Sequence, residues 1–436
     1  MRVHVVGGGF AGVSAAVRLA EAGHAVHLFE SRGALGGRCN SVPPPAGFPL
    51  PLDNGPHLFM GAYRETRALL ETLRIPDPFH WIDPLALAWL LPGGRRVSLE
   101  AAPLPAPFHL LLGLLETDAF SPGDKRRLVL ALVKLRFTRY PGLTVAQFVK
   151  REGFGSGAQD RFWGPLTRAV CNVAPEQAPL ESLAGVFRKA FFGRRFDSAL
   201  AVPRVPLGEI LGSSVARYLA DRGGAVRLRE GFTAMGRDDL QLVGQTPKAE
   251  ALRADAWVLA VPPERLAALL PGELWAQPPA GLGKSPIVTA HLRLSHPVLE
   301  GHLVGLSGAA FEWVFNRNAN QDLRMEGQVL SLVCSADEAL AKKPESELLA
   351  LAWGELRDRC PAAKKSELMA GRVTKEPAAT FRLTLETAPL RPGPSTPLPK
   401  VVLAGDWTDT GLPATVEGAV LSGRRAAEVL LRPLDR

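Results

Sequence analysis

The sequence has 436 residues, which is enough for two packed domains and too long for one ordinary core. Apolar residues make up 46% and charged residues 22%, a balance that excludes a disordered or collagen-like chain. The formal charge of +8 favours an anionic partner: a phosphate-bearing cofactor, nucleic acid or an acidic lipid surface. Nucleic acid is the least favoured of these, because Lys and Arg are scattered and no recognition module is present.

The start of the chain turns into glycines after six residues and lacks the apolar segment of a signal peptide. We therefore expect the protein to stay in the cytoplasm. The longest nearly uncharged apolar stretch, residues 104–115, is too short to span a bilayer. The cysteines are far apart, with no pattern typical of a metal site or a disulfide framework, and we expect reduced, mostly buried thiols. They are Cys39, Cys171, Cys334 and Cys360.

The first thirty residues predict a strand, a helix and a second strand. Residues 3–6 are a β-branched run, residues 12–22 are rich in Ala and Leu, and residues 25–29 form another apolar run. Gly23 is placed to end the helix. This order predicts one βαβ unit.

A glycine motif G-x-G-x-x-G lies between the first strand and the helix. Gly7 permits a tight turn, Gly9 lets the backbone approach a pyrophosphate, and Gly12 lets helix and strand pack closely. Glu30 ends the second strand, where a carboxylate accepts hydrogen bonds from ribose hydroxyls and disfavours a 2′-phosphate. Together these features predict dinucleotide binding. The cofactor contacts expected here are Gly7, Gly9, Phe10, Ala11, Gly12, Glu30 and Ser31.

Two further elements favour FAD over NAD. Gly36 and Gly37 let a second loop fold over the cofactor, and Arg38 can neutralise pyrophosphate oxygens. Near the other end of the chain, Asp406 follows a buried strand and is placed to bind a ribityl hydroxyl of FAD. Residues 413–419 then begin a helix, which either approaches the flavin ring or packs as an ordinary terminal helix. The cofactor contacts expected from these and neighbouring segments are Gly36, Gly37, Arg38, Asn54, Gly55, Phe232, Gly405, Asp406, Thr415, Val416, Glu417 and Ala419.

Downstream, residues 256–261 and 401–404 are short apolar runs suited to a buried parallel sheet. Residues 64–220 carry leucine-rich helical patterns and residues 285–335 alternate as strands do. The sequence therefore predicts an α/β fold: a Rossmann-type FAD-binding domain built from discontinuous segments, with an interleaved α+β substrate-binding domain. We assign residues 1–75, 208–280 and 390–436 to the first domain and residues 76–207 and 281–389 to the second.

With both glycine motifs and the C-terminal Gly-Asp, the chain resembles the amine oxidase and phytoene desaturase superfamily, and within it the hydroxysqualene dehydroxylases of squalene and hopanoid synthesis. The resemblance implies FAD, a hydrophobic isoprenoid substrate and reduction of hydroxysqualene to squalene. Pro56 stands where that family has a glutamine, and proline donates no hydrogen bond. The narrower match rests on residues 52–57, 61–66, 161–166, 203–207, 285–289 and 405–408.

The candidate catalytic residues are His57, Asp53 and Tyr63, with His57 or Asp53 as the proton donor that helps hydroxide leave. The alternative for this segment is a solvated turn. Phe311, Trp313 and Phe315 alternate, so on a strand they share one face and line either a substrate tunnel or the core. Residues 286–292 contain no lysine, unlike the corresponding strand of amine oxidases, which favours a hydrocarbon substrate.

Two other functions stay open: an isoprenoid desaturase of the same fold, and a non-catalytic lipid-binding protein that retains FAD. The sequence does not name the electron donor.

Residues 125–139 bracket an apolar run with Lys and Arg, a candidate for peripheral contact with the inner face of a membrane. Those charges fall all round a helix axis, so a buried helix with charged ends is the favoured alternative.

Overall fold

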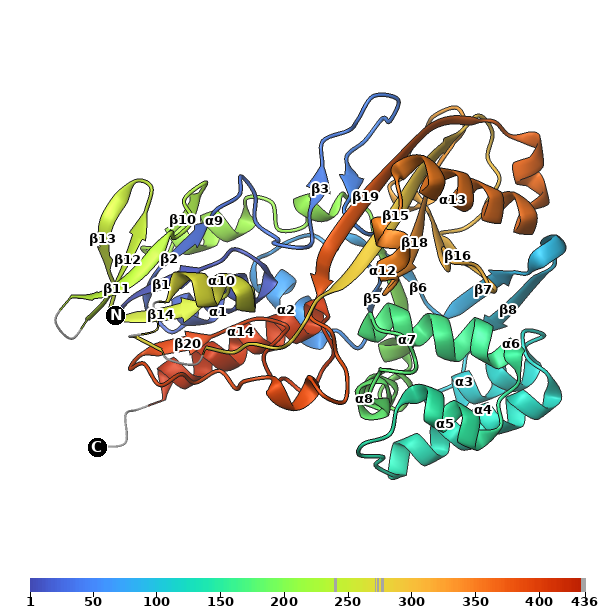
Figure 1. The fold of residues 1–436 in the computed structure, drawn as a ribbon, viewed down its shortest axis with the longest axis horizontal. Coiled ribbons are helices and arrows are strands. Elements are labelled where there is room, and N and C mark those ends of the chain that lie inside the picture. The colour runs from blue at the N-terminus through green and yellow to red at the C-terminus, as the bar shows by residue number, and fades with distance from the viewer. Residues whose placement is uncertain (239–240, 271, 273, 276–277, 433–436) are drawn as a thin grey trace.

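The computed structural model describes residues 1–238, 241–270, 272, 274–275 and 278–432. Figure 1 shows two halves joined by two long strands, with the N-terminus in the half on the left. A five-stranded sheet forms the left half, and a seven-stranded sheet with a group of helices forms the right half. The joining strands are β15 (Ser285–Leu294) and β19 (Leu368–Thr380).

The five-stranded sheet has the order β10-β2-β1-β14-β20, and all its neighbouring strands run parallel. Strands β1, β2, β14 and β20 are mostly buried, as expected for a parallel sheet between helices, whereas the edge strand β10 is partly exposed. The predicted βαβ unit and both downstream strands are confirmed, as is the Rossmann-type α/β fold. The elements are β1 (Arg2–Val6), α1 (Phe10–Glu21), β2 (Ala25–Glu30), α9 (Ser214–Ala220), β10 (Ala225–Leu228), β14 (Ala256–Leu259), α10 (Pro263–Leu269), β20 (Val401–Leu403) and α14 (Val416–Leu431).

The seven-stranded sheet has the order β19-β15-β18-β17-β16-β7-β8. Its pairs are antiparallel except β16 with β7. Helix α13 (Glu345–Arg359) buries Leu348, Ala352 and Leu356 in the core on one side of this sheet, at the i, i+4, i+8 spacing of an amphipathic helix. The other strands are β7 (Ala86–Leu90), β8 (Arg96–Glu100), β16 (Leu303–Leu306), β17 (Trp313–Asn316) and β18 (Gln328–Ser335).

A group of helices lies at the lower right of Figure 1, below the seven-stranded sheet. The prediction of helices over residues 64–220 is right for this group but wrong for residues 79–82 and 200–203 and for β7 and β8, which are strands, because short apolar runs have no period that separates strand from helix. The helices are α3 (Phe108–Glu116), α4 (Pro122–Phe137), α5 (Val145–Glu152), α6 (Ser156–Ala158), a π-helical turn (Gln159–Trp163), α7 (Gly164–Cys171) and α8 (Leu180–Phe191).

Smaller elements complete the fold. They are β3 (Ser41–Val42), β4 (Leu52–Asp53), β5 (Phe59–Met60), α2 (Arg64–Thr72), β6 (Phe79–Ile82), β9 (Leu200–Pro203), β11 (Ala234–Asp238), β12 (Gln241–Thr246), β13 (Ala249–Arg253), α11 (Arg317–Asn320) and α12 (Glu338–Lys342). Among them, β11, β12 and β13 form a separate three-stranded sheet at the far left of Figure 1. Within the described ranges, no helix combines the length and hydropathy needed to cross a bilayer. The strands of the five-stranded sheet come from residues 2–30, 225–259 and 401–403. The exact domain boundaries stay a prediction. The last of them, residue 436, lies outside the described part of the chain.

Candidate active site

The first glycine loop has a geometry that only glycine can adopt. Gly7 has φ +112°, and a Cβ there would lie 2.4 Å from the carbonyl oxygen of Ala260. A Cβ on Gly12 would lie 1.9 Å from the carbonyl oxygen of Gly7. Strand, turn and helix therefore pack without side chains between them.

The start of α1 presents an open, positive helix end. Gly9 is the N-cap, no side chain caps the helix, and the first turn carries no acidic residue. The N–H groups of Phe10, Ala11 and Gly12 have no intrahelical acceptor at this position. A Cβ on Gly9 would meet only the Cα of Gly37, at 3.8 Å, so the space beside the loop is open. An anionic phosphate fits such a cradle.

The second glycine loop lies directly against the first. The Gly36 N–H donates to the carbonyl of Gly8 over 2.9 Å, and Gly9 and Gly36 form a parallel bridge. Gly36 has φ +113° and Gly37 has φ +62°. The two motifs, separated by a strand and a helix in sequence, thus form one backbone cradle.

Glu30 lies beneath this cradle, at the end of β2. Its Oε2 accepts the Gly8 N–H at 2.8 Å, and its Oε1 accepts the Arg32 N–H at 2.8 Å and the Ser31 hydroxyl at 3.1 Å. The carboxylate is buried and holds the loop in place. Its expected contact with a ribose stays a prediction.

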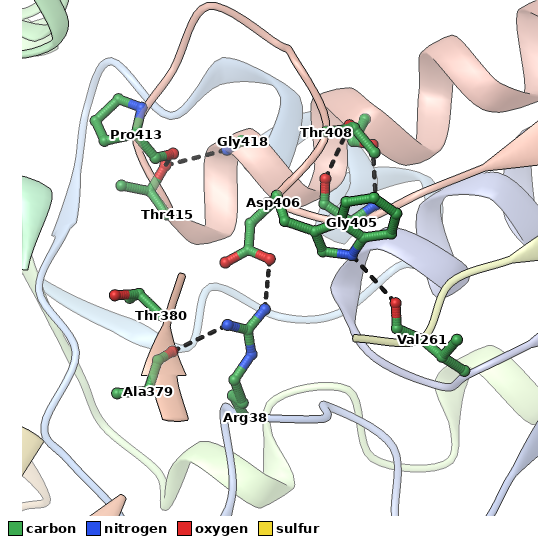
Figure 2. A network of polar contacts seen from close by, with 12 residues as sticks. Arg38, Val261, Ala379, Thr380, Gly405, Asp406, Thr408, Pro413, Thr415 and Gly418 are labelled. Atoms are coloured by element: carbon green, nitrogen blue, oxygen red, sulfur yellow. Dashed lines mark hydrogen bonds and ion pairs between the residues drawn. The ribbon is translucent and has the colours of Figure 1, made fainter. Parts of the chain in front are cut away.

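Arg38 and Asp406 meet in the structure, although the sequence assigned them to different parts of FAD (Figure 2). Arg38 Nη2 lies 2.5 Å from Asp406 Oδ1, and Arg38 Nη1 donates to the carbonyl of Ala379, in β19, over 3.0 Å. Asp406 is almost completely buried, whereas a third of the Arg38 side chain is exposed. The pair ties the second glycine loop to the C-terminal segment.

The turn after β20 is held by hydrogen bonds that Figure 2 shows. The Gly405 N–H donates to the Ser422 hydroxyl at 2.9 Å, and the Thr408 hydroxyl donates to the Gly405 carbonyl at 2.9 Å. The Trp407 indole N–H donates to the carbonyl of Val261 at 3.1 Å. These bonds fix Asp406 at the carboxyl edge of the sheet, where α/β folds bind ligands.

Helix α14 packs against α1 and so brings the two ends of the chain together. A Cβ on Gly423 would lie 2.1 Å from the carbonyl oxygen of Ala11, and the Ser14 hydroxyl donates to the carbonyl of Val420 at 2.8 Å. Thr415 caps the helix by accepting the Gly418 N–H at 3.1 Å. Val416 and Ala419 pack in the core beneath this helix.

Two of the expected cofactor contacts have other partners. The buried Glu417 carboxylate accepts the N–H groups of Glu65 at 3.0 Å and Thr66 at 2.9 Å, so its side chain caps α2 instead of facing a flavin. Burial raises the pKa of Glu417. The Phe232 ring packs edge-on against Phe29 and Trp257, which makes it part of the core. The sequence did not reveal that these two side chains are structural, because the residues that they contact lie far away along the chain.

His57 lies between β4 and β5 and is the best-placed proton donor. Its Nδ1 donates to the carbonyl of Gly55 at 2.8 Å. Burial lowers the pKa of His57, but Cys39, the Gly55 carbonyl and Asp53 outweigh burial and raise this pKa to about 9. The imidazole is therefore protonated at neutral pH. Cys39, expected only as a buried thiol, lies beside the His57 ring, and no signal in the sequence revealed this proximity.

Tyr63 lies close to the same group of residues. Burial and the nearby Glu417 raise the pKa of Tyr63, so the phenol stays neutral, and Thr415 lies beside it. The structure thus brings Tyr63, His57 and Cys39 together with the start of α14.

Asp53, in contrast, is fully engaged in the fold. Its Oδ1 accepts the Ser41 hydroxyl at 2.7 Å and the Leu207 N–H at 2.9 Å, and its Oδ2 lies 3.3 Å from Arg317 Nη1. Both members of this ion pair are buried. The structure therefore argues against Asp53 as the acid and gives it a structural role.

The loop containing Asn54 and Gly55 lies against β15. A Cβ on Gly55 would lie 3.4 Å from Ile287 Cγ2 and 3.8 Å from Thr289 Oγ1. Asn54 Oδ1 and Thr289 Oγ1 are buried without a hydrogen-bond partner within the described part of the chain. Buried polar atoms normally have partners, so these two atoms suit a polar group that the protein binds. The open cradle at Gly9 and these atoms fit FAD.

An apolar cavity lies between the seven-stranded sheet and the group of helices. Met60 of β5, three residues after His57 in the sequence, is one of its lining residues. It measures about 70 Å³. Arg161 and Ser198 are its polar neighbours. The full lining is Met60, Leu85, Leu87, Trp89, Leu99, Leu110, Leu114, Leu132, Arg161, Phe162, Leu166, Phe191, Ser198, Leu200 and Trp313.

The expectation that three aromatic side chains share one face is wrong for Phe311. Strand β17 begins only at Trp313, because the N–H groups of Ala310 and Phe311 bond to the Glu355 carboxylate at 2.7 and 3.0 Å. Phe311 packs in the core that α13 covers. Trp313 and Phe315 do lie in one cluster, but only Trp313 lines the cavity.

The sequence matches the flavin-containing amine oxidoreductase family over residues 10–431. A hydroxysqualene dehydroxylase of Rhodopseudomonas palustris is 32% identical over 98% of both chains. A 15-cis-phytoene desaturase of an Oncidium hybrid cultivar is 24% identical over 100% of this chain and 78% of its own length. Among solved structures, an oxidoreductase of Methanosarcina mazei has a TM-score of 0.78 at 17% identity, covering 98% of this chain and 100% of its own.

Proposed function

Since the chain belongs to the family of flavin-containing amine oxidoreductases that includes the hydroxysqualene dehydroxylases, we propose that it reduces hydroxysqualene to squalene. It is an FAD-dependent oxidoreductase. The observation that supports this substrate is the apolar cavity, whose lining includes Met60, three residues after the protonated His57 in the sequence. An amine substrate has no support, since β15 carries no lysine.

Bound FAD, once reduced, supplies the hydride that this reaction needs. The new C–H bond replaces a C–O bond, and the departing hydroxide takes one proton to leave as water. The protonated His57 side chain can donate that proton, and the Gly55 carbonyl keeps the ring oriented by accepting from Nδ1. The cavity walls exclude water and hold the hydrocarbon chain.

The cavity is smaller than the chain it has to hold. Small-molecule sites commonly measure roughly 300–1,000 Å³, against about 70 Å³ here. Leucine, methionine and phenylalanine dominate the lining, and their side chains can rotate to admit an alkyl chain. We further propose that this alcohol is taken up at a membrane surface, where such an apolar compound accumulates.

Loss of the proton donor tests the proposal. His57→Ala should slow turnover of hydroxysqualene while the flavin absorbance of the protein stays unchanged. Unchanged turnover would remove His57 from the mechanism.

A second candidate is an isoprenoid desaturase, which the similarity to the 15-cis-phytoene desaturase favours. The electrons then flow from the isoprenoid to the cofactor. Incubating the oxidised protein with phytoene or squalene under anaerobic conditions and recording flavin bleaching separates the two functions.

A further inference from the structure

Exposed apolar side chains gather on and just before two helices, α3 and α4. Of the eleven large hydrophobic side chains exposed in the described part of the chain, six lie within residues 104–137. Phe137 is 79% exposed and Phe108 is 59% exposed, values unusual for phenylalanine. The six are Leu104, Phe108, Leu115, Leu130, Val133 and Phe137. We call this set the α3–α4 surface.

Helix α4 is apolar on two opposite faces. Leu128, Ala131, Leu132 and Leu135 are buried in the core. Leu130, Val133 and Phe137 follow the spacing i, i+3, i+7 and therefore form one exposed stripe. The sequence-based interpretation of a buried helix with charged ends is thus wrong, because one of the two apolar faces is exposed.

Cationic side chains flank the exposed stripe. Arg126 begins the stripe, one turn before Leu130. The Arg136 guanidinium lies 5.4 Å from the centre of the Phe137 ring. Within the described ranges neither arginine has an acidic partner. Helix α4 carries five cations (Lys125, Arg126, Arg127, Lys134, Arg136) and one acidic residue, Asp124, which is buried.

The inner faces of the same two helices line the apolar cavity. Leu110 and Leu114 of α3 and Leu132 of α4 belong to its lining. A single layer of helix therefore separates the cavity from the exposed apolar stripe. No other exposed cluster in the described structure has this relation to the cavity.

We propose that the α3–α4 surface docks on an anionic lipid bilayer, so that the isoprenoid passes from the bilayer between α3 and α4 into the cavity. The apolar stripe enters the boundary between headgroups and acyl chains, and Arg126 and Arg136 contact lipid phosphates. This inference rests on the proposed function for the nature of the substrate. Charge complementarity favours a bilayer over a second copy of this chain, because two such surfaces would bring like charges together.

Vesicle binding of the FAD-loaded protein tests the docking surface. The parent should bind vesicles that contain phosphatidylglycerol more tightly than vesicles of phosphatidylcholine alone. The triple variant Leu130→Gln, Val133→Gln, Phe137→Gln should lower the partition coefficient by about tenfold or more. The matched control changes three exposed apolar residues elsewhere, Leu228→Gln, Met369→Gln and Leu390→Gln, and should bind like the parent.

The charge contribution is measured with Arg126→Gln, Arg136→Gln. This pair should weaken binding to phosphatidylglycerol vesicles about fivefold or more and leave binding to phosphatidylcholine vesicles unchanged. Unchanged flavin absorbance and melting temperature show that each variant is folded.

Turnover separates this proposal from the proposed function. With hydroxysqualene in vesicles the apolar triple variant should lose activity, and with the same substrate in detergent micelles it should match the parent.

Equal vesicle binding by parent and triple variant overturns the docking proposal. A dimer that the triple variant converts to a monomer also overturns it, by identifying an interface between copies. Vesicle binding by the parent without turnover in either medium supports docking and contradicts the proposed function.

Discussion

The half of the molecule that surrounds the cradle and the half that surrounds the cavity are built from different kinds of contact. The cradle is made of backbone: Gly7, Gly12 and Gly36 bring main chain against main chain, and a single carbon added at any of them would collide with a carbonyl oxygen. The cavity is made of interchangeable apolar side chains from strands and helices. A small substitution in the cradle should therefore abolish cofactor binding, whereas a substitution in the cavity should weaken substrate binding only in part.

The largest effect is expected in the cradle. Gly12→Ala places a Cβ 1.9 Å from the Gly7 carbonyl oxygen, so β1 and α1 have to separate. We expect almost no FAD in the purified protein, measured as flavin absorbance per chain. The control is Gly354→Ala in α13, where a Cβ meets nothing within 4 Å. Normal FAD content in the Gly12 variant would show that the cradle is less rigid than described.

His57 lies where the two halves meet, and its loss should affect chemistry alone. Removing a proton donor commonly costs about 10²-fold or more in rate. We expect His57→Ala to lose that factor in turnover and to retain FAD. Because the protonated form acts, parent kcat/KM should be flat below pH 8 and fall as pH rises through about 9. A profile that rises over that range would mean that His57 acts as a base.

Asp406→Asn should have a smaller effect on the cradle. The substitution removes the charge opposite Arg38, and a hydrogen bond between charged groups contributes roughly 1.5–3 kcal/mol. We expect the Kd for FAD to rise about tenfold, measured by fluorescence titration of the apoprotein. Asp160→Asn, at an exposed position in the helical group, serves as the matched control. An unchanged Kd would show that the Arg38–Asp406 pair does not contribute to FAD binding.

The smallest effect is expected in the cavity. Leu114→Trp fills part of the lining, and loss of about 1 kcal/mol of apolar contact raises KM roughly fivefold. FAD content should stay normal. The neighbouring Leu115 points to solvent, so Leu115→Trp adds the same side chain and should leave KM in detergent unchanged. Equal KM values for both variants would place the substrate elsewhere.

The difference between a cradle made of backbone and a cavity made of side chains also explains which features could be predicted from the sequence. Glycine spacing and short buried strands encode backbone geometry locally, so the βαβ unit, the downstream strands and the meeting of both chain ends were predictable from Gly7, Gly12 and residues 401–404. The cavity could not be predicted, because its lining comes from strands and helices spread from Met60 to Trp313. Asp53 and Glu417 looked available in sequence, since their partners, Arg317 and Thr66, lie hundreds of residues away.

The central claim is that electrons pass from the reduced cofactor to an isoprenoid alcohol. The direct measurement is an anaerobic single turnover, in which the chemically reduced protein receives hydroxysqualene and both flavin absorbance and extracted lipid are followed. The account predicts reoxidation of the flavin together with squalene in equal amount. A flavin that stays reduced, with no squalene formed, would contradict it.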